Sequence, residues 1–203
     1  MQLRAPAIIL SARPHGETAV IVRVLTRAEG MVAAYVAGGR GRTLRPVVMP
    51  GNLVAADIRS KSDTQLPFAR LELVQSRGPW LSEPLPAAAI SWVCALSATV
   101  MPERNPYPGL YSALSALLNA ICNAPSARGW AEALVTYEML LLRELGYGTE
   151  GGWADRPNGA DFAAVMTAFA ALSQPIEHYL LADRKGDVMA ARTLLGTRLA
   201  KMA

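Results

Sequence analysis

Residues 19–37 read AVIVRVLTRAEGMVAAYVA, two runs of apolar and β-branched residues separated by a glycine at position 30. Side chains of this kind favour extended strands, and Gly30 marks a turn between two of them. Runs of similar texture cover residues 7–13, 52–59 and 68–74. Five short strands in this length predict a small closed barrel, and the five-stranded OB-fold is the common barrel of this size.

A basic segment, residues 38–46 (GGRGRTLRP), joins the third and fourth runs and carries Arg40, Arg42 and Arg45. A guanidinium group is always charged, and its fork of donors matches the geometry of a phosphate. Glycine lets the backbone come close to a ligand. The segment therefore predicts a flexible basic loop that contacts a phosphate backbone, with a solvated turn as the alternative.

The chain of 203 residues has a formal net charge of +4, and this charge is unevenly distributed. Residues 1–80 contain eleven Lys/Arg and five Asp/Glu, a net of +6, whereas residues 81–203 contain nine and eleven, a net of −2. The excess in the first part indicates that this part meets a polyanion. Further candidate contacts to such a polyanion are Arg13, Arg59 and Lys61.

Beyond residue 80 the apolar residues change to helical spacing. We predict helices over residues 87–100, 109–124, 130–145, 161–172 and 188–202, and a shorter helix over 176–181. Gly146 is the expected C-terminal stop of the third helix, and residues 146–159 are expected to form a loop. The predicted fold is α+β: an OB-fold barrel over residues 1–80 and an α-helical bundle over residues 81–203.

Composition and motifs exclude several classes of protein. No apolar run is long enough to span a membrane and the N-terminus lacks a signal peptide, so a cytoplasmic protein without membrane contact is expected. Cys94 and Cys122 lie in apolar helical segments and are expected to pack as small hydrophobic residues. With only His15 and His178 besides, the chain offers no zinc quartet, and no metal or cofactor is expected.

An enzyme is not expected, and no catalytic residue is assigned. The sequence has neither a G-x-x-x-x-G-K-[ST] loop nor a G-x-S-x-G elbow, and it shows no carboxylate cluster for a nuclease metal. His15 follows a proline and is interpreted as a turn residue rather than a catalytic base. Tyr35 and Phe68 lie in strand runs and are interpreted as core residues, with base stacking as the alternative.

Several motifs, taken in order, resemble the bacterial recombination mediator family RecO. Residues 7–18 (AIILSARPHGET) resemble the family's opening strand and its R-P-x-x-E-[ST] turn, and 25–30 (LTRAEG) its next turn. Residues 36–40 (VAGGR), 44–46 (LRP) and 49–51 (MPG) resemble its glycine-arginine loop and the turn that follows. Residues 138–148 (EMLLLRELGYG) resemble a helix ending in L-G-[YF]-G. The resemblance covers residues 1–80 well and the helical part more loosely.

The resemblance implies a non-enzymatic DNA repair and recombination mediator. Such a protein binds single- and double-stranded DNA, anneals complementary strands, and works with RecR to load RecA onto strands covered by single-strand-binding protein. It also implies that the helical domain binds the acidic C-terminal tail of the single-strand-binding protein. Many relatives carry a cysteine-bearing segment after L-G-[YF]-G, which forms a zinc site in some. Here loop 146–159 contains no cysteine in that place.

A second function from another class is compatible with the same residues. An OB-fold adaptor would use its basic loop to bind an acidic protein partner in place of DNA. Affinity for a generic oligonucleotide separates the two, because phosphate neutralisation by arginine supplies affinity that does not depend on base sequence.

Overall fold

The computed structural model describes residues 2–60, 62, 65–147, 161–183 and 188–202. The chain divides into two compact units. One consists of Met1–Ser82 with Met101–Tyr111, and the other of Glu83–Val100 with Ser112–Ala203. Residues 101–111 lie beyond the boundary predicted near residue 80, and they belong to the first unit.

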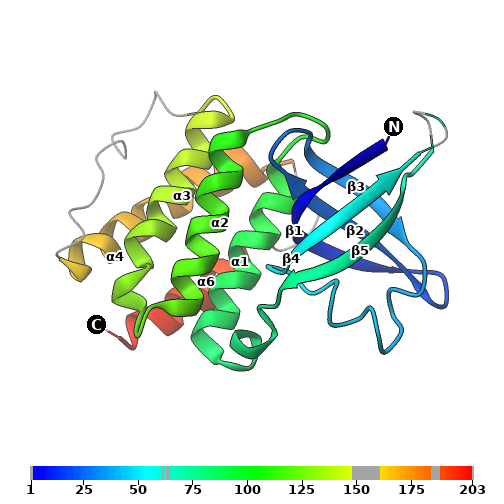
Figure 1. Cartoon of the computed structure of the whole chain (residues 1–203). Coiled ribbons are helices and arrows are strands. Elements are labelled where there is room, and N and C mark those ends of the chain that lie inside the picture. Colours follow the sequence, from blue (N-terminus) through cyan, green and yellow to red (C-terminus); the bar gives the residue numbers. More distant parts are fainter. Residues whose placement is uncertain (1, 61, 63–64, 148–160, 184–187, 203) are drawn as a thin grey trace. The chain divides into compact units, whose positions relative to one another are not determined.

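Five strands form a closed barrel in the first unit, in the order β1-β2-β3-β5-β4 around the barrel (Figure 1). The strands are β1 (Gln2–His15), β2 (Ala19–Thr26), β3 (Gly30–Val36), β4 (Leu53–Arg59) and β5 (Phe68–Gln75). All neighbouring pairs are antiparallel except β3 and β5, which pair in parallel. The OB-fold barrel predicted from the sequence is confirmed, and its first strand is longer than predicted.

Strand β1 closes the barrel because it is long enough to pair with two neighbours. Residues 2–8 pair with β4, and residues 7–15 pair with β2. A bulge between Ile9 and Ser11 shifts the register, which exchanges the inward and outward side chains along the strand. Ala7 and Ile9 therefore face the core before the bulge, and Ala12 packs against the core after it.

The barrel core consists of small and β-branched side chains that alternate with outward-facing ones. In β5, Ala69 and Leu71 point inward, while Arg70 and Glu72 are exposed. The alternation of apolar and polar residues in this strand thus places one of its faces toward water. The other strands fill the core with Val20, Val22, Val24, Val32, Ala34, Val36, Val54, Ala56 and Ile58.

Residues 101–111 pack on the turn between β2 and β3. The Arg104 amide donates to the Met31 carbonyl at 2.8 Å, and Glu103 pairs with Arg23 at 3.6 Å. Gly30 has a φ of +68°, and a Cβ at this position would lie 2.0 Å from the backbone oxygen of Asn105. Only glycine satisfies both the positive φ and the close approach, which explains the Gly30 turn signal in the sequence.

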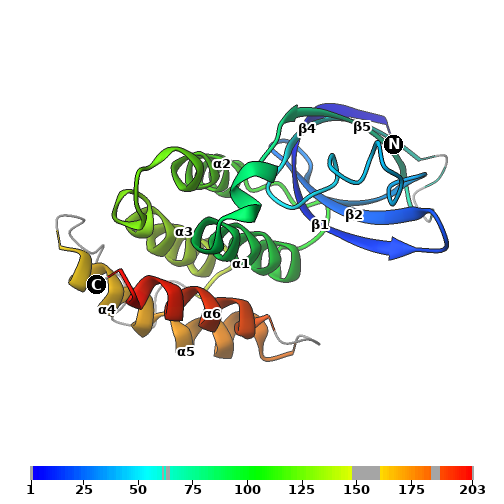
Figure 2. The same cartoon turned by 90° about the horizontal axis from the view of Figure 1, so that it is seen from below.

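Helices make up the second unit and follow the predicted ranges closely (Figure 2). The long ones are α1 (Pro84–Val100), α2 (Pro108–Asn123), α3 (Ala131–Glu144), α4 (Phe162–Ala171) and α6 (Met189–Ala200). The short ones are η1 (Gly78–Ser82) in the barrel unit, η2 (Ala127–Gly129), α5 (Ser173–Pro175) and the π-helical turn η3 (Ile176–Leu181). Helix α1 packs against α6, and α3 packs against α4.

Capping interactions define where α3 ends and where α4 begins. Gly146 takes a φ of +97°, its amide donates to Arg143, and the Tyr147 amide donates to Leu142, which together satisfy the last carbonyls of α3. The predicted stop at Gly146 is confirmed. Asp161 caps α4, because its carboxylate accepts from the Ala163 amide at 2.9 Å.

A buried ion pair lies in the core of the helical unit. The Arg192 guanidinium donates to the Glu138 carboxylate at 2.7 and 3.0 Å, and the Trp92 indole donates to it at 2.7 Å. The Glu138 side chain is 0% exposed and that of Arg192 is 4% exposed. Burial raises the pKa of Glu138, while the charge and hydrogen bonds of Arg192 act in the opposite direction. Cys94 and Cys122 are buried, as predicted.

Candidate nucleic-acid interface

Arg40 is held at the tip of the hairpin between β1 and β2. Its amide donates to the Thr18 carbonyl at 2.9 Å, and its guanidinium donates to the carbonyls of Gly16 and Glu17 at 3.1 and 3.0 Å. The neighbouring Gly39 is buried so closely that a Cβ would lie 2.4 Å from a Val20 methyl group. Arg40 therefore has a structural role at the hairpin tip, and its exposed guanidinium keeps further donors for a ligand.

Arg42 and Arg45 lie on a turn that is pinned to the barrel. The Arg45 amide donates to the Gly41 carbonyl at 2.9 Å, and the Val48 amide donates to Leu44 at 3.1 Å. Val48 is buried in the barrel core, with Leu44 packed against it. The sequence predicts a flexible loop here; the structure instead shows a hydrogen-bonded turn anchored by apolar side chains.

Asn52 provides a second anchor for this turn. Its buried side-chain amide donates to the Pro46 and Val47 carbonyls at 2.7 and 3.1 Å, and its oxygen accepts from the Arg77 amide at 2.7 Å. Both Arg42 and Arg45 are nevertheless exposed. Within the part of the chain that the structure describes, neither guanidinium has a hydrogen-bond or ion-pair partner. Two exposed arginines on a fixed turn are placed to bind the phosphates of a polyanion.

One row of side chains runs across the outer surface of the barrel. Arg13 of β1 pairs with Ile21 of β2, Ile21 with Tyr35 of β3, Tyr35 with Phe68 of β5, and Phe68 with Arg59 of β4. Residues paired across a sheet share a face, so these five side chains, the outer row, all point outward. With neighbouring strands about 4.8 Å apart, the row extends over roughly 19 Å.

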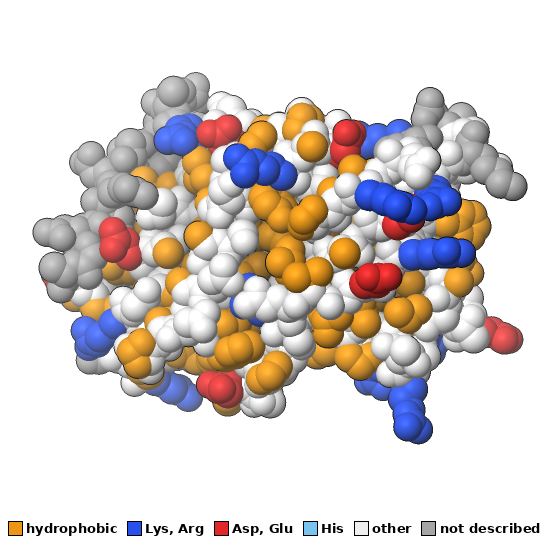
Figure 3. Space-filling model, in the orientation of Figure 1, with side chains coloured by type: hydrophobic (Ala, Val, Ile, Leu, Met, Phe, Trp, Pro, Cys, Tyr) orange, Lys and Arg blue, Asp and Glu red, His pale blue; other side chains and the backbone are white. Residues whose placement is uncertain are grey.

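Aromatic side chains occupy the middle of the outer row. The Phe68 side chain is 64% exposed, and its ring meets Tyr35 edge-on at a centroid distance of 5.2 Å. Tyr35 in turn meets His15 at 5.9 Å. The interpretation of Phe68 as a core residue is therefore wrong, and Tyr35 is half-buried. Figure 3 shows Lys and Arg side chains interspersed with hydrophobic ones over the barrel surface.

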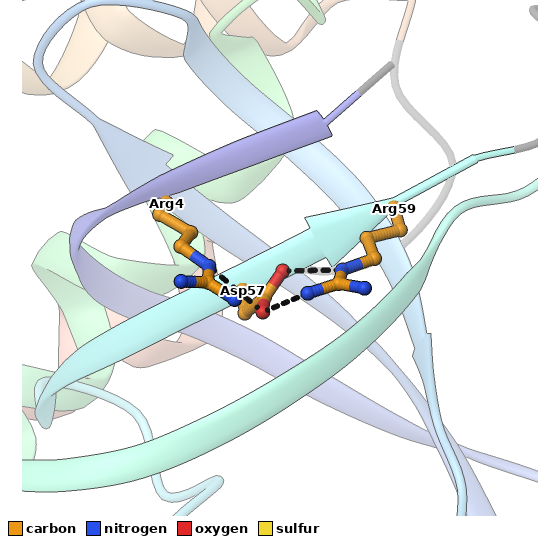
Figure 4. Close-up of polar contacts among 3 residues, drawn as sticks. All are labelled: Arg4, Asp57 and Arg59. Atoms are coloured by element: carbon orange, nitrogen blue, oxygen red, sulfur yellow. Dashed lines mark hydrogen bonds and ion pairs between the residues drawn. The ribbon is translucent and has the colours of Figure 1, made fainter.

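An acidic residue offsets part of the charge beside the outer row. Asp57 of β4 accepts from Arg59 at 2.9 and 2.8 Å and from Arg4 of β1 at 3.1 Å (Figure 4). The Arg59 hydrogen bonds, with the positive charge of Arg4, hold the pKa of Asp57 below its ordinary value. Asp57 thus stays ionised and occupies two donors of Arg59, which leaves Arg59 fewer for a phosphate.

The structure brings together some of the predicted contacts and adds others. Arg13 and Arg59 lie in one row, and Arg40 reaches the hairpin tip that follows Arg13. Lys61 lies outside the described residues. Arg4 of β1 and Arg70 of β5, which were not predicted as contacts from the sequence, lie beside Asp57.

The exposure of Phe68 had a signal in the sequence. In the alternating run 68–74, every second side chain lies on the same face of the strand, so Phe68 lies on the face of Arg70 and Glu72. These polar residues mark the face that meets water.

Among the described residues, no group of three or more His, Cys, Asp and Glu is placed to hold a metal ion. The helices described in the structure include none that is long and apolar enough to cross a membrane. The loop predicted over residues 146–159 falls almost entirely outside the described residues, which resume at residue 161.

Comparison with known proteins identifies similar chains. Residues 1–77 match the family described as Recombination protein O N terminal, and residues 82–150 match Recombination protein O C terminal. A DNA repair protein RecO from Rhodospirillum centenum is 43% identical over 153 residues, which is 75% of this chain and 60% of the relative. The proteins of the same name from Phenylobacterium zucineum and Rhizobium etli are 40% and 38% identical, each over 152 residues and 74% of this chain, covering 61% and 57% of the relatives. The chain thus spans about three fifths of these relatives' length.

Proposed function

The chain belongs to the RecO family of DNA repair proteins, and from this premise we propose that its barrel binds DNA through the backbone phosphates. The observation that carries the proposal is the pair Arg42 and Arg45, two exposed cations without a partner in the described chain, on a turn fixed to the barrel. The net charge of +6 in residues 1–80 supports it. Because phosphate contacts carry no sequence information, the binding is independent of base sequence.

The other candidate residues contribute to different degrees. Arg40 contacts phosphate with the donors that the hairpin carbonyls leave over, and Arg13 extends the basic surface along the outer row. Arg59 contributes less than Arg13, because its guanidinium already donates twice to Asp57. Lys61 remains a proposed contact on the basis of its charge and its place in the sequence.

The wider proposal is a non-enzymatic mediator that acts in the cytoplasm. We infer that it binds single- and double-stranded DNA, anneals complementary strands, and helps RecR to load RecA onto strands covered by single-strand-binding protein. The helical unit is proposed to bind the acidic C-terminal tail of that protein. Family membership supports these roles, and the basic barrel supplies the binding that does not depend on base sequence.

The test measures affinity for single- and double-stranded oligonucleotides at several salt concentrations. Each neutralised phosphate contributes about 0.7 to the slope of log affinity against log salt on single strands and about 0.9 on duplexes. The double variant Arg42→Ala/Arg45→Ala should therefore lower the slope by up to about 1.4 and 1.8. Arg27→Ala/Arg143→Ala is the matched control, because it removes two exposed arginines from other parts of the surface.

Unchanged affinity and slope in a folded Arg42→Ala/Arg45→Ala variant would show that the turn is merely solvated. If the wild-type chain binds no oligonucleotide but does bind an acidic protein partner, the adaptor function is correct instead. Arg40 is changed separately, because Arg40→Ala also removes two hydrogen bonds at the hairpin tip and should lower the melting temperature.

A further inference from the structure

We propose that Phe68, supported by Tyr35, is a stacking platform for an unpaired base of single-stranded DNA. The inference rests on the proposed DNA binding and adds a preference for one type of strand. Arginine contacts serve any phosphate backbone, whereas an exposed aromatic ring selects for bases that are free to leave a stack.

The Phe68 ring is exposed and is held in place by neighbouring rings. Among the described residues, Phe68 has the highest exposed fraction of the large hydrophobic side chains, 64%. Its ring does not project alone, because Tyr35 packs against it at 5.2 Å with an interplanar angle of 69°. His15 supports Tyr35 in the same way at 5.9 Å. A ring that is held in place loses little conformational freedom when a base stacks on it.

The surface beside the Phe68 ring is hollowed. Phe68 lines a hollow of about 380 Å³ together with Ala37, Asp57, Arg59, Ala69 and Arg70. This volume lies within the range of pockets that take small ligands. The hollow joins an apolar wall, suited to the flat face of a base, to a charged rim formed by Arg59, Arg70 and the carboxylate of Asp57, which is paired with Arg59.

Arginines lie on both sides of the Phe68 ring on the outer surface of the barrel. Arg13 and Arg59 lie at the two ends of the outer row, and Arg70 lies two residues from Phe68 on the same face of β5. An aromatic ring with cations on both sides is the arrangement that binds single strands, where bases stack while phosphates meet arginines. A base inside a duplex is stacked on its neighbours and cannot reach the ring.

The experiment compares Phe68→Ala, Phe68→Leu and Phe68→Trp in the full chain, with an oligothymidylate and a duplex as probes. Base stacking on an aromatic residue is lost on substitution by alanine at a cost of about 5- to 150-fold in affinity. We expect this loss for the single strand in both Phe68→Ala and Phe68→Leu, because leucine has no aromatic face. Phe68→Trp should bind at least as tightly as the wild type.

Two features separate this loss from a general defect. The salt slope and the duplex affinity should stay at wild-type values, because no cation has been removed. Val74→Ala is the matched control: Val74 is another strongly exposed apolar residue of β5, at 60% exposure, and its change should leave single-strand affinity unaltered.

Wild-type single-strand affinity in Phe68→Ala would overturn the stacking inference while leaving phosphate binding intact. An equal loss on single strand and duplex would also overturn it, since Phe68 would then act through the fold. A wild-type chain that binds neither probe would refute the proposed function itself, and with it this inference.

Discussion

Replacing Arg192 by methionine should destabilise the helical unit strongly, because it leaves the carboxylate of Glu138 buried without its cation. Arg192 donates to both oxygens of Glu138 and to the Phe169 carbonyl, and its guanidinium lies 3.9 Å from the centre of the Phe169 ring. Methionine keeps much of the apolar stem and removes these interactions. Of the residues that the structure describes, only the Trp92 indole would still donate to the carboxylate.

Breaking a buried ion pair by removing one partner costs about 3–5 kcal/mol. In a chain of this length, each kcal/mol shifts the melting temperature by about 2–4 °C, so the expected decrease is about 6–20 °C. The matched control is Arg143→Met, which breaks the exposed pair between Arg143 and Glu144. That change should cost no more than about 1 kcal/mol.

The destabilisation should depend on pH in a defined direction. Burial already raises the pKa of Glu138, and loss of Arg192 removes the main opposing influence, so this pKa rises further. A carboxyl group whose pKa is higher in the folded state than in the unfolded state binds more protons when the chain is folded. The free energy of unfolding therefore decreases as pH rises above the pKa of this group in the unfolded state. The difference between wild type and Arg192→Met should therefore shrink as pH falls from 7 towards 4.5.

Urea unfolding followed by circular dichroism at 222 nm reports mainly on the helices and measures the free energy of unfolding. The double change Glu138→Leu/Arg192→Met should be more stable than Arg192→Met alone, because a well-filled apolar pair leaves no buried charge. A loss below about 1 kcal/mol for Arg192→Met would refute the reasoning. So would a difference from wild type that does not change between pH 7 and pH 5.

Two further predictions concern a turn and a metal. Gly30→Ala should destabilise the barrel by about 2–5 kcal/mol in thermal unfolding, since a Cβ there meets the Asn105 backbone at 2.0 Å on top of a positive φ. Gly16→Ala is the control, with a φ of +62° but open space, and should cost only about 1–2 kcal/mol; equal losses would contradict the role of the close contact. Elemental analysis of the purified protein should find no stoichiometric zinc, because residues 146–159 contain no cysteine, and one zinc per chain would show this prediction to be wrong.

Local patterns account for what could be predicted of the fold. The period of two in residues 19–26 and 68–74, the glycine at position 30 and the helical spacing after residue 80 report on which side of an element is buried. The end of α3 at Gly146 is also a local feature, because it depends on the backbone conformation of that single residue. Such features are set by neighbours in the chain, so one sequence is enough to recognise them.

The candidate site was predictable only in part. The run of arginines in residues 38–46 marks a basic surface, but the sequence cannot show that Leu44 and Val48 pack onto the barrel and make the turn a fixed one. The position of Phe68, in contrast, was predictable from the sequence, because the alternation of the strand places it on the exposed face with Arg70 and Glu72. The general preference of phenylalanine for the core led to the wrong interpretation.

By itself, the sequence determined the strand and helix pattern, the basic character of residues 1–80 and the resemblance to the family, because composition and periodicity belong to short stretches of chain. Only the tertiary structure decided which side chains meet. The outer row depends on the register of five strands, and the pairing of Arg4 with Asp57 joins residues 53 positions apart. The burial of Glu138 against Arg192 likewise joins positions separated by 54 residues. A charge is neutralised or left free by its neighbours in space, and those neighbours exist only once the chain has folded.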